Sequence, residues 1–287
     1  MRDHLDRRSF LAAMSALPLR AAAARDLEHE VGITTSSFQG HLGPKPGQLA
    51  LLDLPRIVRD EFGMRVIDLN TNTLGSLEPE ALNRFREAAA KAGCVLTNLK
   101  MNQREIDIGA ADPELRRHAI AEYKRAIDAA AHLGCRWARP LPRANKPDFA
   151  LYVAGYRELA EYAGVRKVQM LVENFGWMES DPDAIPRVVA AVGRNIAASP
   201  DTGNWTDNTV RYRGLAAAFP LTVTCDFKAK TLDANGEDRD YDLKRCFQLG
   251  WDAGFKGPWC LEILDPDRPK LFRNLLLVRD RLRTWLK

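Results

Sequence analysis

The stretch Ala163-Gly164-Val165-Arg166-Lys167-Val168-Gln169-Met170-Leu171-Val172-Glu173-Asn174 contains the unit from which the fold can be predicted. A segment with helical periodicity leads into this stretch and is followed by Gly164. The short apolar run at residues 168–172 comes next, and the carboxylate of Glu173 follows it. Glycine commonly closes a helix with a left-handed turn, and an uninterrupted apolar run is typical of a strand buried on both faces. The stretch therefore predicts a helix, a turn at Gly164 and a buried strand over residues 168–172.

The same unit recurs along the chain. Gly63, Gly93, Gly134, Gly164 and Gly193 each end a helix-period segment and precede a short apolar run, at intervals of 30, 41, 30 and 29 residues. With three further apolar runs, the sequence predicts eight strands, at residues 31–36, 66–69, 95–96, 136–137, 168–172, 195–198, 221–225 and 259–264.

Strands that alternate with helices predict an α/β fold with a parallel sheet. Eight such units over residues 26–287 match the usual size of a closed (β/α)8 TIM barrel of about 250 residues, so we expect a single-domain barrel. An open doubly wound sheet is the alternative. It would normally contain a glycine-rich phosphate-binding turn, and the sequence has neither GxGxxG nor GxxxxGK[ST].

Residues 1–25 are predicted to be an export signal and not part of the barrel. Arg7-Arg8-Ser9-Phe10-Leu11 precedes a short apolar stretch and then four alanines, which is the layout of a Tat-type signal. This predicts contact with the Tat export machinery and a periplasmic location; a basic arm on a cytoplasmic protein is the alternative. The apolar stretch is shorter than the roughly 20 residues that span a bilayer, so we expect no stable membrane insertion.

The charge and the cysteines exclude several classes of protein. The 287 residues have a net charge of +4, but five arginines and two aspartates of that balance lie in residues 1–25, and the remainder is nearly neutral. A nucleic acid partner is therefore not expected.

The five cysteines show no CxxC spacing and are expected to be structural. A zinc nuclease on this barrel would need several histidines at strand ends, and only His41 is placed to reach such a site.

Carboxylates follow three of the predicted strands. Active sites of these barrels lie at the C-terminal ends of the strands, where the sequence places Glu173, Asp201 and Glu262. A carboxylate in an apolar run costs several kcal/mol unless a cation compensates it. Ion pairs with Arg139 or Lys230, or a turn cap at Asp201, are the structural alternatives. Three acids at one barrel mouth instead predict a hard divalent cation, Mg²⁺ or Mn²⁺.

Four motifs, taken in order, resemble those of the sugar phosphate isomerase/epimerase group of xylose isomerase-like barrels. They are Val172-Glu173-Asn174, Pro200-Asp201-Thr202-Gly203-Asn204, Lys228-Ala229-Lys230 and Gly257-Pro258-Trp259-Cys260-Leu261-Glu262-Ile263. The resemblance covers about residues 31–287.

This resemblance implies a metal held by a glutamate, an aspartate, a histidine and a glutamate after the fifth to eighth strands. Glu173, Asp201 and Glu262 match three of these positions. The seventh strand has no histidine, and Asp226 is the expected replacement. In ketose 3-epimerases of the group the two glutamates also act as the acid/base pair, so Glu173 and Glu262 are expected to be catalytic. If the metal site has been lost, Lys228 or Lys230 is expected to supply the positive charge.

Further residues near the strand ends are expected to bind the substrate. Lys100, Arg139 and Lys230 can orient hydroxyls or an anionic group, and each is equally well explained as an ion-pair partner. Trp177 is placed to stack on a sugar face or to pack its own loop. The other expected contacts are Asn70, Asn204, Lys228 and His41.

The sequence thus predicts a metal-assisted isomerase or epimerase that acts on a small sugar or keto-sugar. Two carboxylates move the proton, and a divalent ion stabilises the enediolate. A dehydratase or lyase acting on a keto-sugar or inositol derivative with the same site is one alternative, and a non-catalytic periplasmic carbohydrate-binding barrel is another. A homo-oligomer is possible on this scaffold.

Overall fold

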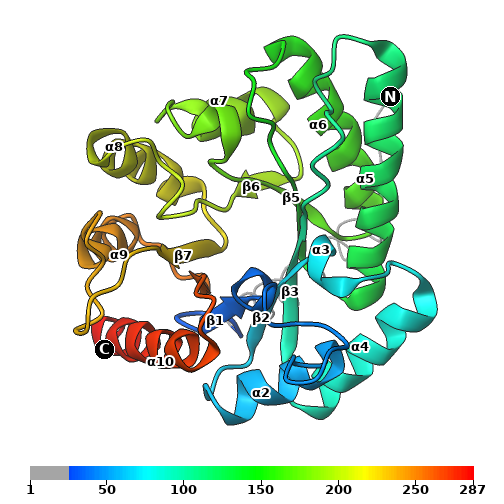
Figure 1. Ribbon diagram of the computed structural model, residues 1–287. Coiled ribbons are helices and arrows are strands. Elements are labelled where there is room, and N and C mark those ends of the chain that lie inside the picture. Colours follow the sequence, from blue (N-terminus) through cyan, green and yellow to red (C-terminus); the bar gives the residue numbers. More distant parts are fainter. Residues whose placement is uncertain (1–25) are drawn as a thin grey trace, which may run out of the picture.

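Eight parallel strands line the inside of a barrel in the computed structural model, which describes residues 26–287 (Figure 1). The predicted export signal, residues 1–25, lies outside the described residues. The strands are β1 Val31–Thr34, β2 Val66–Asn70, β3 Val95–Met101, β4 Trp137–Pro140, β5 Gln169–Val172, β6 Ile196–Ala198, β7 Cys225–Ala229 and β8 Trp259–Ile263. The predicted (β/α)8 barrel is confirmed.

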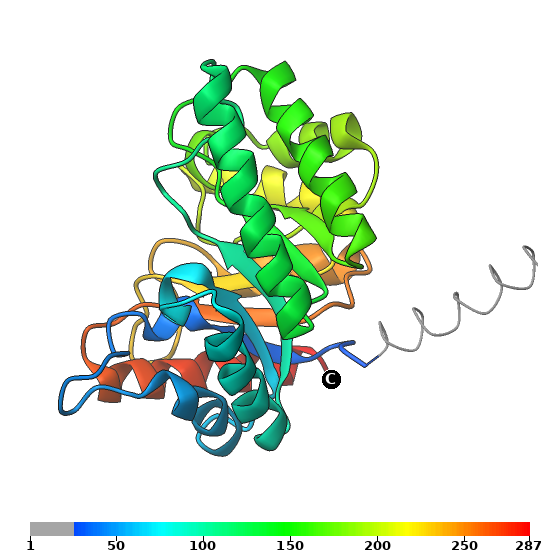
Figure 2. The ribbon, with the colours of Figure 1, turned by 90° about the vertical axis from the view of Figure 1, so that its right-hand side faces the viewer.

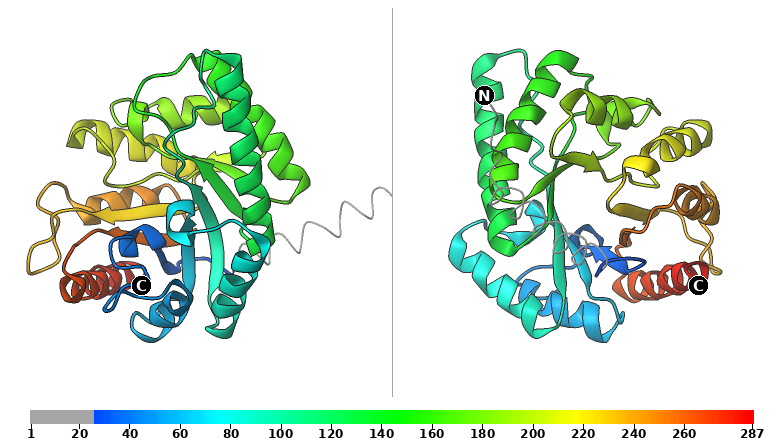
Figure 3. Two further views of the ribbon diagram at one scale, coloured as in Figure 1. Left: turned by 45° about the vertical axis from the view of Figure 1, so that its right-hand side comes forward. Right: turned by 180° about the vertical axis from the view of Figure 1, so that it is seen from behind.

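Helices surround this ring of strands, as the side view and the view from behind also show (Figures 2 and 3). They are α2 Leu54–Asp60, α3 Thr71–Leu74, α4 Pro79–Lys91, α5 Pro113–Leu133, α6 Phe149–Val165, α7 Ala184–Val192, α8 Asn208–Ala218, α9 Leu243–Asp252 and α10 Arg268–Trp285. Four short 3₁₀ segments complete the elements: η1 Thr35–Phe38, η2 Leu51–Asp53, η3 Gly176–Met178 and η4 Phe219–Leu221. None of the helices within residues 26–287 has both the length and the apolarity to cross a membrane.

Aspartates begin five of these helices. The side chains of Asp112, Asp148, Asp207, Asp242 and Asp267 accept hydrogen bonds from backbone N–H groups in the first turns of α5, α6, α8, α9 and α10. An N-cap of this kind satisfies a donor that the helix itself leaves free. Because each cap ends a loop that leaves a strand, the caps also fix the loops on the side of the barrel where a site is expected.

The barrel closes at an irregular seam between β6 and β7. The other neighbouring strands pair through regular parallel ladders, in the order β6-β5-β4-β3-β2-β1-β8-β7. At the seam, isolated bridges join Ala198 to Thr222 and Asp201 to Asp226. The Asp226 amide donates to the Pro200 carbonyl at 2.9 Å, and the Thr202 amide donates to the Asp226 carbonyl at 2.9 Å. Two acidic residues therefore face each other across the closure.

The inward side chains change character along the strands. Near the strand beginnings they form a small apolar cluster, which we call the lower layer: Leu27, Val66, Trp137, Leu171, Ala197 and Cys260. Outward side chains such as Ile67 and Leu99 join the larger core beneath the helices. Because side chains alternate along a strand, the positions two residues beyond Val66, Trp137, Leu171 and Cys260 also point inward. There the residues are charged: Asp68, Arg139, Glu173 and Glu262.

A β-bulge in β3 orients two side chains toward this charged region. The pairing of β2 with β3 shifts its register between Ile67 and Leu69, so that Thr97 and Asn98 both face Asp68. The Thr97 hydroxyl donates to one Asp68 oxygen at 2.5 Å, and the Asn98 amide donates to the other at 3.5 Å. Bulges re-aim side chains in this way. Beyond the bulge, Lys100 is 1% exposed inside the barrel.

Two local expectations were wrong. Helix α6 runs through Gly164 to Val165, and the left-handed residue that ends it is Lys167, with φ of 62°. The predicted strand at residues 221–225 is displaced: residues 219–221 form η4, and β7 begins only at Cys225. Asp226 therefore lies within a strand and not after it.

Candidate active site

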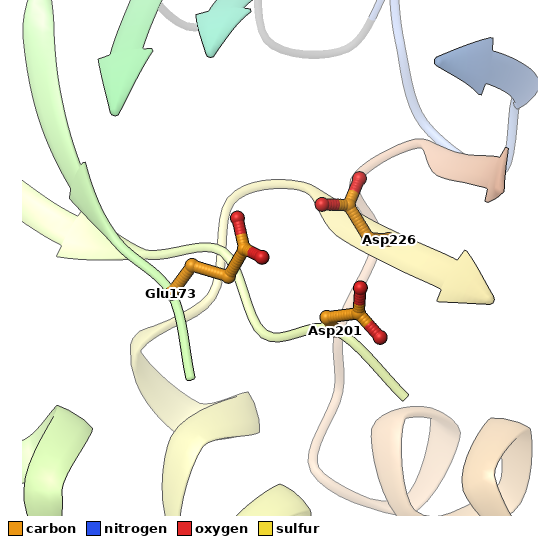
Figure 4. Close-up of side chains that lie close together, drawn as sticks. All are labelled: Glu173, Asp201 and Asp226. Atoms are coloured by element: carbon orange, nitrogen blue, oxygen red, sulfur yellow. The ribbon is translucent and has the colours of Figure 1, made fainter. Parts of the chain in front are cut away.

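Three carboxylates from consecutive elements lie together at the barrel mouth (Figure 4). Glu173 follows β5, Asp201 follows β6 and Asp226 belongs to β7, and one oxygen from each lies within 4.8 Å of the other two. All three are buried. The closing seam of the barrel, which pairs Asp201 with Asp226, is the backbone feature that produces this cluster.

The loop that carries Asp201 is held by Asn174. The Asp201 amide donates to Asn174 Oδ1 at 2.8 Å, and Asn174 Nδ2 donates to the carbonyls of Asp201 and Asn204 at 2.9 and 2.8 Å. Asp201 Oδ1 accepts from the backbone amides of Gly203 and Asn204 at 2.6 and 3.0 Å. Trp205 Nε1 also donates to the Asp201 carbonyl, at 2.9 Å. These bonds leave Asp201 Oδ2 as the oxygen that faces the site.

The fourth acid, Glu262 on β8, has different partners. Its Oε1 accepts from Lys228 Nζ at 2.7 Å, and its Oε2 accepts from the Ser36 hydroxyl at 3.1 Å. Lys100 Nζ lies 3.7 Å from Oε2. Both oxygens of Glu262 are therefore committed to donors from this chain.

Two further cations pair with members of the acidic cluster. Lys100 Nζ forms an ion pair with Asp226 Oδ1 and donates to Thr34 Oγ1 at 3.2 Å. Arg139 Nε lies 2.6 Å from Glu173 Oε2, at ion-pair distance but without the alignment of a hydrogen bond. Lys100 and Arg139, predicted as substrate contacts or ion-pair partners, are thus ion-pair partners in this structure.

The environments separate the pKa values of the acids. Burial raises the pKa of Glu173, of Asp201 to about 6 and of Asp226 to about 7, against the opposing effect of the nearby cations. Burial also disfavours ionised Glu262, but the Lys228 and Lys100 ammonium groups outweigh it and lower its pKa to about 2. Glu262 is therefore the firmly ionised member of the four.

The cluster has the features of a site for a divalent cation. Asp226 Oδ2 is buried and has no hydrogen-bond partner, and Glu173 Oε2 is buried without a hydrogen bond, 2.6 Å from Arg139 Nε. A buried acceptor without a partner costs free energy, and in native proteins it commonly marks a bound ion or water. Carboxylate oxygens are the ligands that Mg²⁺ and Mn²⁺ prefer. Glu173, Asp201 and Asp226 thus fit such an ion, whereas the predicted ligand Glu262 is already held by Lys228 and Ser36.

The other predicted residues divide into two groups. Asn204 and Lys228 lie in the site, where Asn204 Nδ2 donates to Glu173 Oε1 at 3.2 Å and Lys228 Nζ donates to Asn204 Oδ1 at 3.1 Å. Asn70 lies behind it and accepts from Ser36, the partner of Glu262.

The remaining three are engaged away from the carboxylates. His41 Nε2 is hydrogen-bonded to the Asp265 carbonyl at 2.8 Å, on the rim. Trp177 is buried with its ring edge-on to Tyr152, at 5.8 Å between centroids. Lys230 is exposed just beyond β7, and its backbone amide donates to Asp238.

Sequence reasoning missed Ser36, Asn174 and Asp68. Ser36 follows β1, Asn174 follows Glu173, and Asp68 interrupts the apolar run of β2. Each stands at or near a strand end, which is the one signal in the sequence that points to them. What they do depends on contacts with residues more than 25 positions away, so their roles had no local sequence signature.

Comparisons with known proteins agree with this architecture. The family model described as "Xylose isomerase-like TIM barrel" matches residues 60–283. No curated protein matches the chain in sequence. Among solved structures, D-psicose 3-epimerase from Clostridium cellulolyticum H10, determined with D-tagatose, has 15% identity and a TM-score of 0.69, over 90% of this chain and 99% of that one.

Two other structures bear on the site. A xylose isomerase-like TIM barrel protein from Mycobacterium smegmatis in complex with magnesium has 19% identity and a TM-score of 0.66, over 92% of this chain and 99% of that one. An L-ribulose 3-epimerase has 16% identity and a TM-score of 0.66, over 90% and 93% of the two chains. At such identities the likeness is one of fold.

Proposed function

Because the chain belongs to the xylose isomerase-like TIM barrel family, we propose that it is a metal-assisted isomerase or epimerase of a small sugar or keto-sugar. The observation that carries the proposal is the pair of buried glutamates at the barrel mouth with different partners: Glu173 contacts Arg139 and Asn204, and Glu262 contacts Lys228 and Ser36. Burial raises the pKa of Glu173, and two lysines lower the pKa of Glu262. Paired carboxylates whose pKa values are driven apart are typical of an acid and a base that share one reaction.

The proton transfers follow from this contrast. Ionised Glu262 takes the proton from the carbon next to the substrate carbonyl, so that the C–H bond breaks and its electron pair forms the enediolate. Glu173, which keeps a proton more readily, returns one from the other side. Return to the same carbon gives an epimer, and return to the neighbouring carbon gives an isomer.

A divalent ion held by Glu173, Asp201 and Asp226 would supply electrostatic stabilisation of the negative charge that develops on the substrate oxygens. Three features of the chain's own residues support this role. The carboxylates are preorganised by Asn174 and the barrel seam, two of their oxygens have no hydrogen-bond partner, and burial excludes competing water. The magnesium in the M. smegmatis structure supports a metal, and the D-psicose and L-ribulose 3-epimerases support a ketose substrate.

Deuterium exchange tests the proposal. The full chain is incubated with Mn²⁺ in D₂O and ketoses such as D-psicose, D-tagatose and L-ribulose, and NMR follows label at the carbons next to the carbonyl. Epimerisation or isomerisation incorporates deuterium without loss of water, whereas a dehydratase or lyase removes a hydroxyl as well. If no ketose exchanges above a Glu262→Gln control, the proposal fails.

Export is a separate proposal that rests on the sequence of residues 1–25 alone. A C-terminally tagged protein is expected in the periplasm, shortened by the signal. Replacing Arg7 and Arg8 with lysine should leave the full-length chain in the cytoplasm. Full-length wild-type protein in the cytoplasm would refute the assignment.

A further inference from the structure

We propose that the Lys228 ammonium holds Glu262 outside the metal's coordination shell, so that Glu173, Asp201 and Asp226 alone hold the metal and Glu262 is an ionised base that does not coordinate it. This inference rests on the metal-assisted function proposed above. It differs from the arrangement that the family resemblance implies, in which the glutamate of the eighth strand is itself a metal ligand.

The ammonium of Lys228 lies between Glu262 and Asp201. If Glu262 were a fourth metal ligand, the ion would have to bind where this ammonium lies. Lys228 Nζ lies 2.7 Å from Glu262 Oε1, 3.1 Å from Asn204 Oδ1 and 3.5 Å from Asp201 Oδ2. An ammonium has three donors, and here each has an acceptor. The contact with Glu262 Oε1 is the shortest of the three and the contact with Asp201 Oδ2 the longest. A metal ion that reached Glu262 Oε1 would therefore have to displace this ammonium, whereas Asp201 is held less closely.

The fold fixes Lys228 at this place. Its amide donates to Thr202 Oγ1 at 2.9 Å, and its carbonyl accepts from Tyr241 Oη at 2.6 Å. The side chain then passes over Gly203, where an added Cβ would lie 2.8 Å from Lys228 Cδ. The absence of a side chain at position 203 therefore leaves the room through which the lysine reaches the acids.

The two sides of the site differ in what remains to be satisfied. Glu262 has donors on both oxygens, from Lys228 and from Ser36. Glu173 Oε1 accepts from Asn204 and its Oε2 lies 2.6 Å from Arg139 Nε, so Asp226 Oδ2 is the buried carboxylate oxygen of the cluster that has no partner. The oxygen still free to accept a cation is thus in the cluster of three carboxylates and not on Glu262.

The charge balance supports a single divalent ion in addition to Lys228. The charged site at the barrel mouth contains five carboxylates and three cations. The carboxylates are Asp68, Glu173, Asp201, Asp226 and Glu262, and the cations are Lys100, Arg139 and Lys228. With all of them ionised, two negative charges are left, which one divalent ion neutralises. Lys228 therefore accompanies the metal and does not replace it.

Division of the site in this way gives the two glutamates different roles: Glu173 is both a metal ligand and a proton-transfer group, whereas Glu262 transfers a proton without holding the metal. A carboxylate that coordinates a metal shares its lone pairs with the ion and is a weaker base. A carboxylate held only by hydrogen bonds keeps a lone pair with which to take a proton. Lys228 is in this account a positioning residue, because it acts through Glu262.

Binding of Mn²⁺ alone, measured by isothermal titration calorimetry on the full chain, tests the proposal without any activity readout. Glu262→Gln removes a nearby negative charge but no ligand, so it should weaken binding by less than about tenfold. Asp226→Asn should weaken binding by more than about tenfold, since even the partners of metal ligands are worth that much. Lys228→Met should tighten binding by about tenfold, because a nearby positive charge is removed. That gain should disappear in the Lys228→Met/Glu262→Gln double variant, and Lys228→Arg should resemble the wild type.

The proposal is overturned if Glu262→Gln weakens Mn²⁺ binding as much as Asp226→Asn, or if Lys228→Met does not tighten it. Gly203→Ala serves if Lys228→Met does not fold, because the added methyl displaces the lysine stem, and it should shift affinity in the same direction. A wild type that binds no Mn²⁺ defeats both this inference and the metal part of the proposed function. The expected binding pattern without exchange into any ketose defeats the proposed function alone.

Discussion

The two ends of the same strands differ sharply inside this barrel. On β5, Leu171 points into the lower layer, and two residues later Glu173 points into the charged site; on β8, Cys260 and Glu262 repeat the pattern. Both members of each pair are at least nine-tenths buried. Burial of the apolar pair stabilises the fold, whereas burial of the charged pair costs free energy that only their partners offset.

This contrast indicates that the lower layer and the charged site have different roles, the first in stability and the second in chemistry. The lower layer fills the barrel where the strands begin, and its only polar side-chain groups are the Trp137 ring nitrogen and the Cys260 thiol. The charged site contains acids whose pKa values are raised by burial. It also contains a buried carboxylate oxygen, Asp226 Oδ2, that has no hydrogen-bond partner. Substitutions in the two layers should accordingly affect different measurements.

The largest expected effect is on turnover at the charged end. Glu262→Gln and Glu173→Gln should each lower kcat on the ketose that exchanges deuterium by about 10²–10⁴-fold, the usual contribution of a positioned acid or base. Thermal melting should show that both variants fold. Glu161→Gln, an exposed change on α6, is the matched control and should leave kcat unchanged. Equal activity of the Glu262 and Glu161 variants would contradict the assignment.

The next effect is on stability at the apolar end. Leu171→Ala should lower the free energy of unfolding by about 2–5 kcal/mol, because it leaves a cavity in a layer that cannot collapse. Denaturant titration measures this loss. Leu52→Ala, at a leucine that is 46% exposed, should change stability by less than about 0.5 kcal/mol. A Leu171→Ala protein as stable as the Leu52→Ala protein would show that the lower layer is not tightly packed.

The smallest effect is the pH dependence of stability at the charged end. Asp201 and Asp226 have pKa values of about 6 and about 7 in the folded chain, against the ordinary 3.8. The folded state therefore binds these protons more tightly than the unfolded state, so stability without metal falls as pH rises from about 4 to about 7. Mn²⁺ binds the ionised carboxylates, so it should raise Tm more at about pH 8 than at about pH 5.

We expect the two metal-induced shifts to differ by about 2–4 °C, which corresponds to roughly 1 kcal/mol in a domain of this size. Differential scanning calorimetry at both pH values, with and without Mn²⁺, measures the difference. In Asp226→Asn the difference should shrink. Identical shifts at the two pH values in the wild type would mean that these aspartates do not bind the ion.

The contrast between the layers also explains how far the sequence predicts the molecule. Apolar runs located seven strands to within a few residues, because those strands are apolar where they begin. The exception is β7, in which Asp226 and Lys228 interrupt the run and Leu221 belongs to a 3₁₀ turn. The strand that supplies two charges to the site is thus the one that least resembles a buried strand.

For the site itself, position at a strand end pointed to Glu173, Asp201 and Glu262. It did not predict which acids meet, because that depends on the seam that pairs Asp201 with Asp226. The β3 bulge that turns both Thr97 and Asn98 toward Asp68 has no local signature either. The pairing of Lys228 with Glu262 depends on the register of β7 with β8.

Glu173, Asp201 and Asp226 are proposed to form a cation site at the charged end of the barrel. Anomalous diffraction from crystals of the full chain grown with Mn²⁺ would locate the ion. We expect one strong anomalous peak among the carboxylates of these three residues, with Lys228 still bound to Glu262. A map with no peak there, at a Mn²⁺ concentration well above the dissociation constant measured by calorimetry, would contradict it.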